Sequence, residues 1–123
     1  MKSTKRILVV DDTEEWLVLT EKWLTDEGFE CDCAGSAYMA IEYLRKKTYD
    51  LIVIDLYMPQ MSGLKLYDYI LLRYNTIVVV ISNSMDEYIK MLPFKHKYQK
   101  PNDRDKFLKI VKTLTHDYIE ELH

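Results

Sequence analysis

Three short and almost entirely apolar runs punctuate the chain, at residues 7–10, 51–54 and 76–81. Each run is rich in isoleucine and valine, so that an extended chain would be apolar on both of its faces. Such runs are typical of strands in the middle of a parallel sheet, which other elements cover on both sides. The pattern therefore predicts three central strands.

Two further segments predict strands of a different kind. Residues 29–34 alternate apolar side chains with the acids Glu30 and Asp32, the pattern of a half-exposed strand, and such acids protect a sheet edge from pairing with another chain. Residues 95–100 are basic and aromatic, so they predict only a weak fifth strand, which Pro101 ends. We therefore expect these two strands at the edges of the sheet.

Between the strands, apolar residues recur at the helical period, which predicts five helices. Capping residues indicate where the helices begin. The expected starts are Asp12 or Thr13, Ser36, the residue after Gly63, Ser84 or Asp86, and Asn102 or Asp103. The expected apolar stripe of the third helix is Leu64, Leu66, Tyr67, Ile70 and Leu71, and that of the last helix extends from Phe107 to Tyr118, Ile119 and Leu122.

The alternation of strand and helix, five times over, defines the expected fold class. It is α/β, a doubly wound five-stranded parallel sheet with helices on both faces, a flavodoxin-like three-layer sandwich. With the three apolar strands inside and the other two at the edges, the order 2-1-3-4-5 is the economical solution. The switch point of this order lies between the first and third strands. At 123 residues, we expect a single domain over residues 1–123.

Composition narrows the classes of function. The net charge of −3 argues against binding nucleic acid, because a reader of the phosphate backbone would be basic. No apolar run approaches the length of a membrane span, and the first six residues do not lead into a signal peptide. We expect a cytoplasmic protein with no membrane association.

Cys31 and Cys33 lie two residues apart on the expected edge strand, so both side chains point to one face. This spacing is poor for an unstrained disulfide, and no further Cys or His lies at a spacing suited to a metal site. We therefore expect both cysteines to be small buried hydrophobic residues.

Acidic residues stand where two central strands end. Asp11 and Asp12 follow the first strand and Asp55 ends the third, and the expected topology brings these ends together at the switch point, where ligands bind. Alone, each acid would be interpreted as a helix or turn cap. Three neighbouring carboxylates without Cys or His favour a hard cation such as Mg²⁺, to which a backbone carbonyl after Asp55 could add a ligand.

A hydroxyl and an ammonium stand at the next two strand ends. Ser82 ends the fourth strand and Lys100 the fifth. Separately, they would be a cap and a solvated surface lysine. Beside a metal-bound carboxylate, they are groups that could hold a phosphoryl group on it, because its oxygens need donors and cations.

In these residues the chain resembles the receiver domains of two-component response regulators, the CheY-like superfamily, over essentially its whole length. The matching positions are, in order, Asp11-Asp12, Asp55 with Met58-Pro59 and Gly63, Ser82, and Lys100-Pro101. The resemblance implies that Asp55 accepts a phosphoryl group from a sensor histidine kinase or phosphotransfer protein, with Ser82 and Lys100 contacting it. It implies a Mg²⁺ ion held by Asp12, Asp55 and the backbone carbonyl of Tyr57, and by Asp11 largely through water. It also implies a signalling module that catalyses only its own phosphotransfer and dephosphorylation and acts on an unidentified downstream protein. Whether phosphorylation drives dimerisation is left open.

Three positions depart from the family pattern. Asn83 is larger than the small residue usual after the switch hydroxyl. Lys97 stands where the aromatic switch residue is usual, with Tyr98 one position off and expected on the opposite face. Only 18 positions separate Ser82 from Lys100, so we expect a short or irregular fourth helix.

Two other functions remain to be weighed. The departures favour, as the alternative, a receiver-like interaction module that acts independently of phosphorylation. An aspartate-nucleophile phosphohydrolase would need a second acid two residues after the nucleophile, where this chain has Tyr57. A flavodoxin-like cofactor binder is disfavoured because no glycine-rich phosphate loop follows the first strand.

Overall fold

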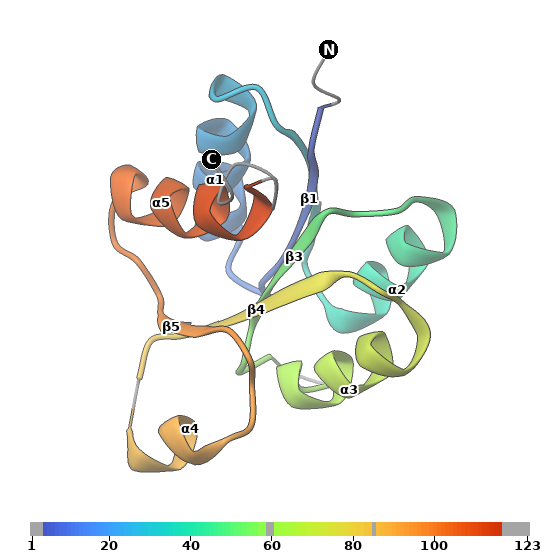
Figure 1. Cartoon of the computed structure of the whole chain (residues 1–123), viewed down its shortest axis with the longest axis vertical. Coiled ribbons are helices and arrows are strands. Elements are labelled where there is room, and N and C mark those ends of the chain that lie inside the picture. Colours follow the sequence, from blue (N-terminus) through green and yellow to red (C-terminus); the bar gives the residue numbers. More distant parts are fainter. Residues whose placement is uncertain (1–3, 59–60, 85, 117–123) are drawn as a thin grey trace.

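A computed structural model of the chain describes residues 4–58, 61–84 and 86–116 (Figure 1). Within these residues, strands and helices alternate along the whole chain. The elements are β1 (Arg6–Val10), α1 (Glu14–Asp26), β2 (Glu30–Ala34), α2 (Ala37–Lys46), β3 (Leu51–Asp55), α3 (Gly63–Arg73), β4 (Ile77–Ser82), α4 (Glu87–Met91), β5 (Lys97–Gln99) and α5 (Arg104–Thr115).

The sheet has the order β2-β1-β3-β4-β5, and every neighbouring pair is parallel. The predicted fold class and strand order are thus confirmed. The register aligns Ile54 with Val10 on one side and with Val80 on the other. The carboxyl ends of β1, β3 and β4 therefore lie level along one edge of the sheet.

Helices cover both faces of the sheet: α1 and α5 lie on one side and α2 and α3 on the other (Figure 1). The alternation of side chains along each strand divides the core in two. Ile7 and Val9 of β1 pack into the α1/α5 layer, whereas Leu8 and Val10 pack into the α2/α3 layer. Fully buried strands with two apolar faces are what the continuous apolar runs predicted.

Side-chain caps begin most of the helices as expected. The Ser36, Asp86 and Asp103 side chains accept hydrogen bonds from the backbone N–H groups of Met39, Ile89 and Lys106. Ser62 caps α3 in the same way, although it was not an expected cap, so α3 begins at Gly63 and not at the residue after it. Thr13 is the N-cap residue of α1 but makes no side-chain capping bond. Four of the five helices thus begin with a side chain that replaces a missing backbone acceptor.

Some expectations about the burial of individual residues are wrong. Leu71 is 52% exposed, because the buried stripe of α3 is made by Leu66, Tyr67 and Ile70, and Leu71 lies one step further round the helix. Cys31 and Cys33 are half-buried rather than buried. Two expectations fall outside the described residues. They concern Pro59, which matches the family pattern, and the last part of the final apolar stripe, at Tyr118, Ile119 and Leu122.

None of the helices that the structure describes could cross a membrane, since even α1, with 13 residues, is too short.

Candidate functional site

The carboxyl ends of β1 and β3 gather three acids. Asp11 is fully buried just beyond β1, Asp12 follows it and is exposed, and Asp55 is the last residue of β3. One carboxylate oxygen from each of the three lies within 4.8 Å of the others. The parallel pairing of β1 with β3 is what brings together acids that stand more than 40 residues apart.

Asp11 is held in place by several groups. One of its carboxylate oxygens accepts a hydrogen bond of 2.8 Å from the backbone N–H of Thr13, and the other accepts one of 2.7 Å from the ammonium of Lys100. The backbone N–H of Asp11 donates to the carbonyl of Ala34 on β2, at 3.0 Å. The carboxylate is therefore paired and fixed although it is buried.

Asp55 is 7% exposed, and its carboxylate accepts a hydrogen bond of 3.3 Å from the backbone N–H of Tyr57. Burial, and secondly the negative charge of Asp11, raise the pKa of Asp55 to about 6, although the Tyr57 N–H and Lys100 oppose this rise. At neutral pH the carboxylate is ionised at a cost in free energy, which a bound cation would reduce.

The loop after β3 depends on a glycine. A Cβ atom at Gly63 would lie 2.4 Å from the carbonyl oxygen of Asp55 and 2.7 Å from the Cα of Leu56. The backbone N–H of Gly63 also donates to the carbonyl of Leu56, at 3.0 Å. Gly63 thus permits the first turn of α3 to contact the end of β3. Glycine is needed here because a side chain has no room, and not because the backbone angle is unusual.

Lys100 lies between the acids and an aromatic ring. Its side chain is 10% exposed, and its ammonium lies 4.9 Å from the ring centroid of Trp16 on α1 while it bonds to Asp11. By sequence, Trp16 is only one of the apolar residues at helical spacing after the first strand. No signal in the sequence pairs it with Lys100, because 84 positions separate the two residues.

Ser82 ends β4 beside this cluster. Asp55 lies opposite Ile81 in the register, so Ser82, on the neighbouring strand, lies one residue further than Asp55 toward the carboxyl ends of the strands. Its hydroxyl is buried and accepts a hydrogen bond of 3.2 Å from the backbone N–H of Ser84, and its carbonyl accepts one of 2.7 Å from the N–H of Lys100. Asn83, which follows, is exposed.

The residues fit a hard divalent cation. Among the described residues, Asp11, Asp12 and Asp55 are the only group of three or more potential metal ligands whose atoms lie this close together, and all three offer carboxylate oxygens. Mg²⁺ prefers such ligands and keeps several waters, which the exposed side of Asp12 would leave room for. The side chain of Tyr57 points to solvent, and its backbone lies beside Asp55.

A separate set of contacts, away from the acidic cluster, joins β5 to the helix α4. As expected, α4 is short, with five residues. The ammonium of Lys97 on β5 donates hydrogen bonds to the carbonyls of Ile89, Lys90 and Leu92 at the end of α4. The neighbouring Tyr98 is exposed. Lys97 therefore caps the carboxyl end of this helix.

The fold and the acidic cluster define a doubly wound α/β protein with a candidate metal site at its switch point. The sequence matches the response regulator receiver domain family over residues 7–112. The chain therefore belongs to that family, a signalling module, and is a receiver domain of the two-component response regulator type.

Similar proteins come from plants and bacteria. The chain is 38% identical over 79 residues to the two-component response regulator ORR26 of Oryza sativa subsp. japonica, an alignment that covers 63% of this chain and 14% of the relative. It is also 38% identical over 79 residues to the Regulator of RpoS of Escherichia coli K12, covering 63% of this chain and 23% of the relative. The alignments thus span less than a quarter of the length of these two relatives.

Solved structures share the fold. The response regulator TrrA of Thermotoga maritima, in complex with Mg²⁺-BeF, has a TM-score of 0.80 and 29% identity, with 90% of this chain and 99% of that chain covered. The receiver domain protein of Methanospirillum hungatei has a TM-score of 0.85 and 23% identity, with 97% and 99% covered.

Proposed function

We propose that this chain is a phosphoacceptor, in which Asp55 receives a phosphoryl group in a Mg²⁺-dependent reaction. The observation that carries the proposal is the cluster itself. A buried carboxylate with a raised pKa lies within 4.8 Å of two other carboxylates, and Lys100 is bonded to one of them. Like charges gathered in this way are stable when cations balance them, and the same cations would neutralise an incoming phosphoryl group.

In the transfer, a carboxylate oxygen of Asp55 forms the new bond to phosphorus while the bond from phosphorus to the imidazole nitrogen of the donor breaks. The leaving imidazole takes up a proton, and the product is an acyl phosphate on Asp55. Lys100, held over Trp16 and against Asp11, supplies a fixed positive charge for the phosphoryl oxygens. Ser82, which lies on the neighbouring strand one residue beyond the position opposite Asp55, supplies a hydroxyl donor.

Asp11, Asp12 and Asp55, with the backbone carbonyl of Tyr57, are the residues proposed to hold the Mg²⁺ ion. When bound, the ion would neutralise the negative charge that builds up on the phosphoryl group. The Mg²⁺-BeF complex of TrrA supports this assignment by analogy, since that protein has the same fold.

The donor would be a sensor histidine kinase or a phosphotransfer protein in the cytoplasm, and the output would be altered binding to another protein. We propose that residues 1–123 act as one domain, with no catalysis beyond phosphotransfer to Asp55 and its hydrolysis. The alignments with the curated relatives cover only part of each, so these assignments rest on the cluster and the family.

Intact mass spectrometry tests the chemistry. The protein is incubated with Mg²⁺ and a small acyl-phosphate donor, beside a metal-free sample and an Asp55→Ala variant. Asp68→Ala is the matched control, because Asp68 is an exposed acid on α3. We expect one added phosphoryl group in the wild type and in Asp68→Ala, and none in Asp55→Ala or without Mg²⁺. Labelling that persists in Asp55→Ala would refute the proposal.

A specific observation favours the second candidate, an interaction module that works without phosphorylation. Lys97 ties β5 to α4 through backbone carbonyls, in a region that would have to respond to phosphorylation. If phosphorylated protein shows no change in amide exchange in α4 and β5, and no partner binds it more tightly, this second function would be preferred.

A further inference from the structure

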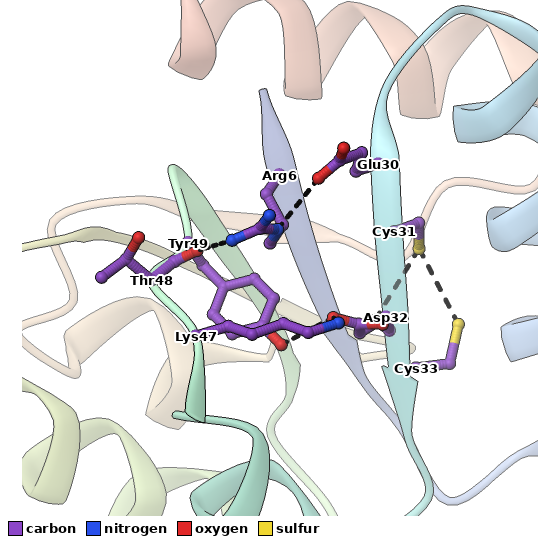
Figure 2. A network of polar contacts seen from close by, with 8 residues as sticks. All are labelled: Arg6, Glu30, Cys31, Asp32, Cys33, Lys47, Thr48 and Tyr49. Atoms are coloured by element: carbon purple, nitrogen blue, oxygen red, sulfur yellow. Dashed lines mark hydrogen bonds and ion pairs between the residues drawn. The ribbon is translucent and has the colours of Figure 1, made fainter. Parts of the chain in front are cut away.

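The edge strand β2 presents different chemistry on its two faces (Figure 2). On one face, the carboxylate of Asp32 accepts hydrogen bonds from the hydroxyl of Tyr49 at 2.8 Å and from the ammonium of Lys47 at 3.1 Å. On the other face, the thiols of Cys31 and Cys33 lie side by side with their sulfur atoms 3.8 Å apart. The thiols of Cys31 and Cys33 thus share one face of β2. Asp32, the residue between them, is held by polar contacts on the opposite face.

The surroundings of the two thiols keep them close together. The Cys33 thiol lies 3.6 Å from the carbonyl oxygen of Leu17 on α1, and the Cys31 thiol lies 3.7 Å from the carbonyl oxygen of Asp32. Both side chains are half-buried against the α1/α5 layer, so they are ordered by packing and still reached by solvent.

The spacing of the two cysteines along the strand bears on two kinds of thiol chemistry. Residues two apart on a parallel strand stand about 6.6 Å apart at Cα, near the upper limit for a disulfide, so this pair is poorly placed to form one. An ion with metal–sulfur bonds of about 2.3 Å, placed between sulfur atoms 3.8 Å apart, would subtend an angle of about 111°, close to tetrahedral. The strand therefore holds the pair at a distance suited to chelation.

We propose that Cys31 and Cys33 form a dithiolate site for a soft d¹⁰ metal ion such as Zn²⁺ or Cd²⁺, separate from the acidic cluster. Each thiol loses its proton to solvent as a metal–sulfur bond forms. The described residues place no third Cys, His, Asp or Glu ligand close enough to complete the set. The remaining positions of the ion are therefore open to water or to a donor of another molecule. Soft thiolates select such ions over Mg²⁺, so the two sites would not compete.

Titration of the reduced protein with Cd²⁺, in excess Mg²⁺ to occupy the acidic cluster, tests the site. We expect one Cd²⁺ per chain and the ultraviolet charge-transfer absorption of cadmium–sulfur bonds. Cys31→Ser and Cys33→Ser should each weaken binding by about 100-fold, because a chelating pair becomes a single ligand. Asp55→Asn should leave the absorption unchanged, which separates this site from the proposed phosphoacceptor.

A second measurement uses the wild-type protein alone, so that it does not depend on how the variants fold. One equivalent of Cd²⁺ should protect both thiols from alkylation, as counted by mass spectrometry. An absence of the charge-transfer absorption at one equivalent, or wild-type Cd²⁺ affinity in either serine variant, would overturn the proposal.

Discussion

The charge of Asp55 is the residue-level feature from which the proposed chemistry follows. Its carboxylate is buried at the end of β3 beside Asp11, and both conditions raise its pKa. A group in this position costs free energy whenever it is ionised without a cation, so the metal-free protein is less stable because of it. This free-energy cost falls on the Asp55 carboxylate, the group that would accept the phosphoryl group.

Asp55→Asn should therefore stabilise the metal-free protein. The pKa in the folded state, about 6, lies above the ordinary value of 3.8, so the folded chain binds more protons between these two values. The stability that this group contributes is present below pH 3.8 and is lost as the pH rises through 6. At neutral pH we expect Asp55→Asn to raise the free energy of unfolding by about 1 to 3 kcal/mol. The gain should vanish in acid.

Urea unfolding in a chelating buffer, at neutral and at acidic pH, measures this difference. Asp68→Asn, at an exposed acid, is the control and should change stability little at either pH. A neutral-pH stability of Asp55→Asn equal to that of the wild type would contradict the argument.

The ion pair of Lys100 with Asp11 should be strongly coupled, since both side chains are nearly or fully buried. Lys100→Met leaves the Asp11 carboxylate without its cation and should lower the free energy of unfolding by about 3 kcal/mol. Asp11→Asn in that background should cost less than it does in the wild type. A double-mutant cycle should give a coupling of at least about 1 kcal/mol, whereas additive effects would refute the coupling.

At the scale of elements, the contact between the end of β3 and the start of α3 shapes the loop beside the cluster. It is close enough that only glycine fits. The contact fixes where the chain turns after Asp55, so a change at Gly63 would act on the site through the backbone.

Gly63→Ala should lower the free energy of unfolding by about 1 to 3 kcal/mol, because its Cβ would meet backbone atoms that cannot rotate away. Gly35→Ala is the matched control, because a Cβ there meets no atom within 4 Å. It should change stability by no more than about 1 kcal/mol, and in either direction. Chemical denaturation compares the two variants, and equal effects would show that the close approach is not limiting.

Lys97 connects β5 to the short helix α4. Its ammonium donates hydrogen bonds to the carbonyls of Ile89 and Leu92 at the end of the helix, and the Ile89 carbonyl also accepts one from the backbone N–H of Leu92. Lys97→Met should lower the local stability of α4 by about 1 kcal/mol. This loss corresponds to a roughly fivefold faster amide exchange in that helix. The protection of β1 and β3 should not change.

Hydrogen exchange with mass analysis of peptides measures this effect. Lys95→Met is the control, because Lys95 is exposed and lies two positions away. Unchanged exchange in α4 of Lys97→Met would mean that the helix is held by the packing of Ile89 and not by the lysine.

At the scale of the whole molecule, the parallel sheet brings distant segments to one edge. The cluster draws on residues from both ends of the chain and from its middle. Ligand binding at this edge should therefore stabilise the fold as a unit, since unfolding separates all of its ligands.

Mg²⁺ at 100 times its dissociation constant should raise the free energy of unfolding by about 2.7 kcal/mol. Asp12→Ala should abolish most of this gain and change the metal-free stability little, because Asp12 is exposed and Asp11 keeps its other partners. Thermal unfolding with and without Mg²⁺ measures both effects. A full Mg²⁺ response in Asp12→Ala would exclude this residue as a ligand.

The sequence by itself determined the elements and their order. Continuous runs of isoleucine and valine suit central strands, and the alternating residues 29–34 suit an edge, so the order 2-1-3-4-5 was the economical solution, which the structure confirms. The same order predicted that Asp11, Asp12 and Asp55 would meet, which they do. Short-range patterns suffice here because they decide which faces of a strand must be covered.

Only the tertiary structure decided the contacts between side chains of distant elements. The stacking of Lys100 over Trp16, the attachment of Lys97 to α4 and the distance between the thiols of Cys31 and Cys33 leave no periodic trace in the chain. They depend on rotamers and on the packing of α1 and α4 against the sheet. A pattern of polar and apolar positions fixes which face a residue occupies, but it does not fix which atoms on that face come within bonding distance.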